Sequence, residues 1–95
     1  MSSQVGVDMR EVSIEMALVE RVKSLNGIAL KLPSVFVKGL PDRMVLLPGA
    51  RIVFVETKAP GKTMSPMQVR WQQKLVGLGF DHRVIDSLEV ARAFA

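Results

Sequence analysis

The chain contains no cysteine, and His82 is its only histidine. The first absence excludes disulfides and thiolate metal sites, and the second excludes zinc sites that need several imidazoles. A metal site in this protein would therefore use oxygen ligands, which suit Mg²⁺ or Mn²⁺. No apolar run approaches the roughly 18 residues that a membrane helix needs, so we expect no membrane association.

The N-terminus also lacks a basic segment followed by an apolar core, so no signal peptide is predicted and we expect a soluble, cytoplasmic protein. Hydrophobic residues make up 48% of the 95 residues, which is ample for one small core. We therefore predict a single domain over residues 1–95. The net charge of +4 fits phosphate binding, although many proteins with no such ligand share it.

The spacing of apolar residues and turn signals predicts an α/β fold with the order α-β-β-β-α-β-α. Helices are expected over residues 9–25, over residues 65–76 and after Ser87, and strands over residues 28–32, 42–47, 51–58 and 80–85. Asp8 with Glu11 is typical of a helix start, and so is Ser65-Pro66 with Gln68.

The first helix carries an apolar stripe at helical spacing, formed by Ile14, Leu18, Val22 and Leu25. At 100° per residue, Glu11 lies within this stripe and Glu15 at its edge. A second apolar face, formed by Val12, Met16 and Val19, indicates either a well-buried helix or a contact between subunits.

A predicted hairpin between residues 42 and 58 places charged side chains together. If Pro48-Gly49-Ala50 is a three-residue loop, Asp42 lies directly opposite Glu56. Opposite side chains in an antiparallel pair have Cβ atoms roughly 4.5–5.5 Å apart, which is close enough for two carboxylates to share one cation. Lys58 follows Glu56 by two residues and so projects to the same side.

Two facing carboxylates beside an apolar strand repel each other unless a cation neutralises them. A bound metal would supply that cation, lower the pKa of a bound water and polarise a phosphoryl oxygen. Lys58 would orient the water or stabilise charge on the phosphate. The simpler interpretation is that Asp42 is a turn residue after Pro41, and that Glu56 and Lys58 form a surface pair.

Four linked motifs resemble the VRR-NUC family, the virus-type replication-repair nuclease branch of the PD-(D/E)XK superfamily. They are Gly39-Leu40-Pro41-Asp42-Arg43, Val53-Phe54-Val55-Glu56-Thr57-Lys58, Pro60-Gly61-Lys62 and Ser65-Pro66-Met67-Gln68. The resemblance implies a restriction-endonuclease-like core with a mixed central sheet.

The resemblance also implies roles for single residues. Asp42 and Glu56 would be metal ligands together with the carbonyl of Thr57, and Lys58 would be the catalytic lysine. Glu15 matches the family's acid on the first helix, a possible further metal or water ligand, while Glu11 competes with it on face geometry. Gln68 matches the family's glutamine near the active site.

Small standalone members of the family are similar to Holliday-junction resolvases, which are homodimers that cut branched DNA with a divalent metal. The resemblance therefore implies a Mg²⁺- or Mn²⁺-dependent DNA endonuclease in a bacterial or phage-infected host cell, with a role in DNA repair. The alternatives are a monomeric nuclease acting on flaps or ends, and a non-catalytic DNA-binding or assembly module. The loop over residues 33–38 departs from the family pattern, which leaves substrate contacts there open.

Several basic residues could contact DNA phosphates or be solvated, namely Arg43, Lys62, Arg70 and Lys74. Gly61-Lys62-Thr63 resembles the end of a nucleotide-binding loop, but Glu56 stands where the earlier glycine should be. No nucleotide cofactor is therefore predicted. Trp71 is expected in the core or at a dimer contact, and His82 is expected to have no ligand role.

Overall fold

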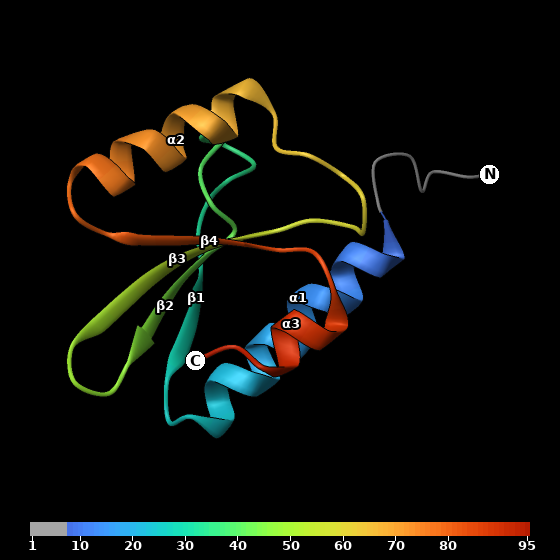
Figure 1. Cartoon of the computed structure of the whole chain (residues 1–95), viewed down its shortest axis with the longest axis vertical. Coiled ribbons are helices and arrows are strands. Elements are labelled where there is room, and N and C mark those ends of the chain that lie inside the picture. Colours follow the sequence, from blue (N-terminus) through green and yellow to red (C-terminus); the bar gives the residue numbers. More distant parts are fainter. Residues whose placement is uncertain (1–7) are drawn as a thin grey trace.

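The computed structural model describes residues 8–95, so the lead-in predicted over residues 1–7 lies outside the described residues. The observed order is the predicted one (Figure 1): α1 (Met9–Ser24), β1 (Ile28–Lys31), β2 (Arg43–Leu47), β3 (Arg51–Thr57), α2 (Pro66–Gly77), β4 (Asp81–Ile85) and α3 (Leu88–Arg92). The predicted limits of the strands and of the first two helices differ from these by one residue at most.

The four strands form one mixed sheet in the order β1-β2-β3-β4. β2 lies antiparallel to β1 and to β3, whereas β4 runs parallel to β3. Leu47 pairs with Arg51, as the three-residue loop predicted, and Arg43 pairs with Val55. The loop can turn this tightly because Gly49 and Ala50 both have positive φ, of 82° and 61°.

The helices cover the two faces of the sheet unequally. Figure 1 shows α1 and α3 together on one side and α2 on the other. The core lies between the sheet and the α1–α3 layer, and its members are Ile14, Leu18, Val22, Val45, Leu47, Val53, Val55, Ile85, Ala91 and Phe94. Helix α2 buries only Leu75, so the second face is thinly covered.

Local sequence signals explain where the helices begin. The Asp8 carboxylate accepts a hydrogen bond from the backbone N–H of Arg10, which caps α1. The predicted apolar stripe is confirmed, since Ile14, Leu18 and Val22 are buried. The second face of α1 is not well buried, because its Val12 and Met16 side chains are exposed. Within residues 8–95, none of the helices is both long and apolar enough to cross a membrane.

Candidate active site

Two acidic side chains meet at the end of the β2–β3 ladder. Asp42 directly precedes β2, and the register of that ladder, continued by one residue, places it opposite Glu56. Side chains alternate between the two faces of the sheet along β3. Val53, Val55 and Thr57 face the α1 side, so Glu56 faces α2. The Glu56 side chain is buried, and the residue is only 2% exposed.

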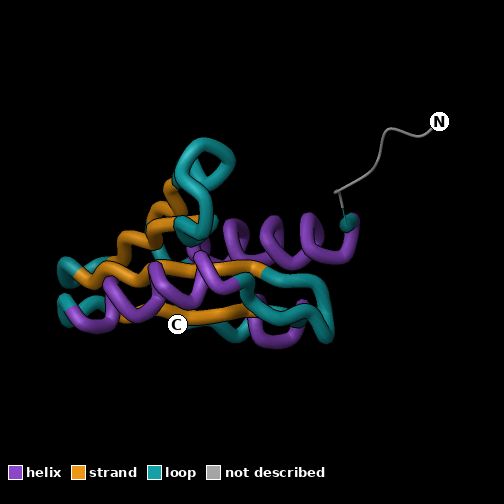
Figure 2. The backbone as a smooth tube through the Cα atoms, turned by 90° about the horizontal axis from the view of Figure 1, so that it is seen from above, coloured by secondary structure: helices purple, strands orange, loops and turns teal. Residues whose placement is uncertain are grey.

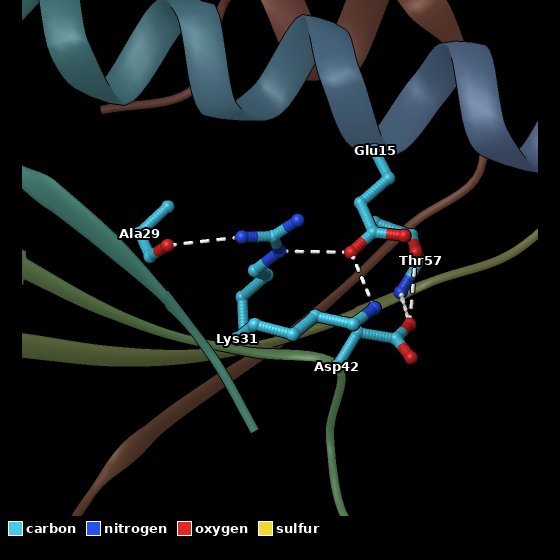
Figure 3. Close-up of polar contacts among 6 residues, drawn as sticks. Glu15, Ala29, Lys31, Asp42 and Thr57 are labelled. Atoms are coloured by element: carbon cyan, nitrogen blue, oxygen red, sulfur yellow. Dashed lines mark hydrogen bonds and ion pairs between the residues drawn. The ribbon is translucent and has the colours of Figure 1, made fainter. Parts of the chain in front are cut away.

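Asp42 is held by the residue that follows Glu56. Its Oδ2 atom accepts hydrogen bonds from the Thr57 backbone N–H at 2.9 Å and from the Thr57 hydroxyl at 2.8 Å (Figure 3). Thr57 is itself fully buried. These two hydrogen bonds from the last residue of β3 fix the orientation of the Asp42 carboxylate at the open end of the hairpin.

Glu56 is held from the α2 side. Its Oε2 atom accepts a hydrogen bond from Gln68 Nε2 at 2.8 Å and lies 3.7 Å from Lys58 Nζ. The Oε1 atom of Gln68 accepts from the Ser65 backbone N–H at 2.8 Å. Because that N–H can only donate, the amide oxygen must face it, and the amide nitrogen must face Glu56. The capping box of α2 thus sets which atom of Gln68 reaches the acid.

The surroundings of Glu56 disfavour the ionised form of its side chain. Burial first, and the Asp42 carboxylate second, raise the pKa of Glu56 to about 8, against a smaller lowering by Lys58. Glu11 adds to the rise. Near neutral pH and without a bound cation, Glu56 therefore carries a proton beside the Asp42 carboxylate.

Glu11 approaches the same acids from α1. Burial raises its pKa, the charge of Asp42 raises it further, and Lys58 and the Ala59 backbone amide lower it. Glu11 thus shares an electrostatic environment with Asp42, Glu56 and Lys58, although it comes from the opposite layer. Three carboxyl groups and one lysine therefore influence one another's protonation at this end of β3.

Glu15 lies one helical turn beyond Glu11 on α1, and its polar contacts are drawn in Figure 3. Its Oε2 atom accepts from Lys31 Nζ and from Arg43 Nε, both at 2.8 Å. Burial acts to raise the pKa of Glu15, but the hydrogen bonds and charges of these two cations outweigh it, so the pKa is lowered. Glu15 is therefore neutralised by its own partners, and a role as metal ligand stays a prediction.

The four basic residues predicted to contact DNA are placed differently. The Arg43 side chain is only 13% exposed and also donates from Nη1 to the Ala29 carbonyl at 3.0 Å. Lys62, Arg70 and Lys74 are exposed, and the Lys74 ammonium lies 5.2 Å from the centre of the Trp71 ring. Arg43 would have to leave its partners to meet a phosphate, whereas the other three are accessible.

Comparison with known proteins identifies the fold and the family. A solved structure described as "VRR_NUC domain" superposes with a TM-score of 0.81 and 28% sequence identity, covering 88% of this chain and 91% of that one. A protein of Acyrthosiphon pisum secondary endosymbiont phage 1 named "Putative nuclease p44" is 45% identical over 83 residues, which span 87% of this chain and 89% of the relative. The chain belongs to the VRR-NUC nuclease family. No family model matches the sequence.

The VRR-NUC assignment implies a divalent metal, and the residues present can be tested against it. Within residues 8–95, no three side chains among His, Cys, Asp and Glu come close enough to form a metal site by themselves. The closest donors are the carboxylates of Asp42 and Glu56, with the Thr57 backbone beside them. These are all oxygen donors, so they fit Mg²⁺ or Mn²⁺ by ligand type. A cation would replace the proton that Glu56 otherwise holds.

Lys31 is a contact that the sequence did not reveal. It pairs with Arg43 across β1 and β2, and both side chains reach Glu15. The sequence predicted both strands but not their register, because residues 32–42 form a long connection with no turn of defined length. Without that register, the two cations could not be assigned to one acid.

Proposed function

We propose that this VRR-NUC protein is a DNA endonuclease that depends on Mg²⁺ or Mn²⁺. The observation that carries the proposal is Glu56, a buried acid with a raised pKa that faces Asp42 and lies 3.7 Å from Lys58. Such an arrangement costs stability unless a cation binds, which makes it typical of a functional site. Family membership identifies the reaction class as phosphodiester hydrolysis.

Each residue at the site has a role in this proposal. Asp42, Glu56 and the Thr57 carbonyl would hold the metal, which supplies Lewis acidity toward the phosphate and acidifies water. Lys58 would donate to a non-bridging phosphate oxygen or to the attacking water, and so stabilise developing negative charge. Gln68 holds the Glu56 carboxylate in one orientation. Of the two candidate acids on α1, Glu11 is the better one for a further ligand, because Glu15 is already paired.

We further propose that the protein cuts branched DNA as a homodimer. Support comes from the likeness of small family members to junction resolvases, from the net charge of +4 and from the exposed basic residues Lys62, Arg70 and Lys74. Two symmetric sites suit paired nicks across a junction. The exposed apolar side chains of Val12 and Met16 provide surface on which subunits could meet.

The test is a cleavage assay on a labelled four-way junction, a flap and a linear duplex, with Mg²⁺, Mn²⁺ or chelator. Asp42→Asn keeps an oxygen for Thr57 but removes the charge, and Lys58→Ala removes the ammonium. We expect both variants to lose metal-dependent cutting. The matched controls Glu20→Gln and Lys23→Ala, at exposed positions of α1, should retain it.

Failure to cut any of these substrates with either metal would favour a non-catalytic DNA-binding module. Cutting of flaps or ends alone, by a protein that light scattering shows to be monomeric, would favour the monomeric nuclease.

A further inference from the structure

The connection between β1 and β2 is a loop that projects beyond the strands, drawn in teal in Figure 2. The Leu32 backbone N–H donates to the Asp42 carbonyl at 2.9 Å and closes its base. Within it, the backbone N–H groups of Phe36 and Val37 both donate to the Pro33 carbonyl, at 3.0 and 2.9 Å. The loop is therefore built from its own hydrogen bonds and ends directly at one of the active-site acids.

The tip of this loop is apolar and almost fully exposed. Val35 is 85% exposed and Phe36 is 88% exposed. Burying a phenylalanine side chain stabilises a fold, and this fold forgoes that stabilisation at Phe36. The residue that follows Val37 is the exposed Lys38, so a cation stands beside the apolar tip.

The base of the loop is anchored beside the candidate site. Gly39 has a φ of 87°, and a Cβ atom placed on it would lie 2.6 Å from the backbone carbon and oxygen of Met67. Met67 belongs to the first turn of α2 and precedes Gln68, which holds Glu56. The end of the loop thus packs directly against the start of α2, one residue before the glutamine that bonds the buried acid.

The shape of the tip favours a nucleobase over a protein as its partner. A stable protein interface buries about 800 Å² on each side, whereas one phenylalanine buries about 150–250 Å². Two side chains at the end of a narrow loop fall well short of such an interface. An exposed phenylalanine with an exposed lysine two residues further along the loop matches the apolar wedges that enter base steps while cations meet the phosphates.

We propose that Phe36 stacks on a base at a branch point or end of the DNA, while the same strand runs on to Asp42 and Glu56. This inference rests on the proposed function, since it assigns the substrate feature that the site would recognise. Bases at branch points, flaps and ends have a face that is not covered by a continuous stack, so an aromatic side chain can stack on them without opening a duplex first. Phe36 would thereby select branched or frayed DNA over continuous duplex, with Val35 packing at the edge of the base.

The test is equilibrium binding to a four-way junction and to a continuous duplex of the same length, measured by fluorescence anisotropy in chelator so that no cutting occurs. Base stacking by an aromatic residue is worth about 1–3 kcal/mol, so Phe36→Ala should weaken binding to the junction about 5- to 150-fold and leave duplex binding nearly unchanged. Phe36→Trp should restore the affinity. The control Leu78→Ala removes another exposed apolar side chain and should change neither.

Equal affinities of wild type and Phe36→Ala for the junction would overturn the inference, and so would an equal loss for junction and duplex. A change in oligomeric state on Phe36→Ala, with unchanged DNA affinity per subunit, would show that the tip contacts a second copy instead. The binding assay is independent of catalysis. If junction binding depends on Phe36 but the protein cuts no substrate, only the proposed nuclease activity is contradicted. If Phe36→Ala cuts normally and with unchanged substrate preference, only this inference is contradicted.

Discussion

Replacement of Glu56 by glutamine should change how the stability of the metal-free protein depends on pH. The pKa of this acid is raised from 4.5 to about 8 by burial and by Asp42. Between these values the folded protein retains a proton that the unfolded chain has released, so the free energy of unfolding falls as the pH rises. A pKa change of this size corresponds to an upper limit of about 5 kcal/mol, and we expect a loss of about 2–5 kcal/mol between pH 5 and pH 9.

Glutamine resembles the protonated acid. It can accept the hydrogen bond from Gln68 with its oxygen and donate from its nitrogen to Asp42. Glu56→Gln should therefore be about as stable as wild type at pH 5 and more stable at pH 9. Glu11, whose pKa is also raised, remains in the variant and should leave it a smaller slope.

The assay is urea denaturation in chelator at intervals from pH 5 to pH 9, followed by circular dichroism. The lowered pKa of His82 reduces stability only as the pH falls below 6.5, and it does so equally in both proteins. The difference in the free energy of unfolding between wild type and variant therefore reports the contribution of Glu56. Addition of Mg²⁺ at pH 8 should raise the melting temperature of wild type more than that of the variant. Parallel stability profiles, or a variant less stable than wild type at pH 9, would refute the reasoning.

The other predictions concern the supports of the site. Gly39→Ala should destabilise the protein by about 2–4 kcal/mol in urea denaturation, because the new Cβ meets the Met67 backbone at a positive φ. Gly61→Ala, also at positive φ but with nothing within 4 Å, should cost only about 1 kcal/mol, and equal costs would contradict the close approach. Gln68→Ala should raise the Mg²⁺ concentration needed for half-maximal cleavage about 10-fold or more, whereas the exposed-site control Gln73→Ala should not. An unchanged metal requirement in Gln68→Ala would contradict its positioning role.

Local sequence was sufficient for much of the fold and for the two central acids. A three-residue turn leaves one register for the strands that it joins, and side chains alternate with a period of two. Asp42 opposite Glu56 therefore followed from counting outward from Pro48-Gly49-Ala50, and the β2–β3 ladder has that register. The position of Gln68 followed from the capping box at Ser65, which needs only four consecutive residues.

Other parts of the site depend on contacts between distant segments. Glu11 and Glu15 are four residues apart on one helix face, so periodicity cannot tell which of them approaches the acids of the hairpin. The rise between them is about 6 Å, and the position of α1 along the sheet decides between them. That position depends on the packing of Ile14, Leu18 and Val22 against the strands, and on the pairing of Glu15 with cations from β1 and β2.

The sequence by itself determined the order of the elements, the hairpin register and the presence of two acids and a lysine on one side of it. Only the tertiary structure decided that Glu56 is buried and that Glu15 is paired with Lys31 and Arg43. The physical reason is that alternation and turn length act between neighbours along the chain, whereas desolvation depends on what α1 and α2 bring over each end of the strands. The raised pKa at Glu56, on which the proposed metal chemistry depends, is a property of that assembly.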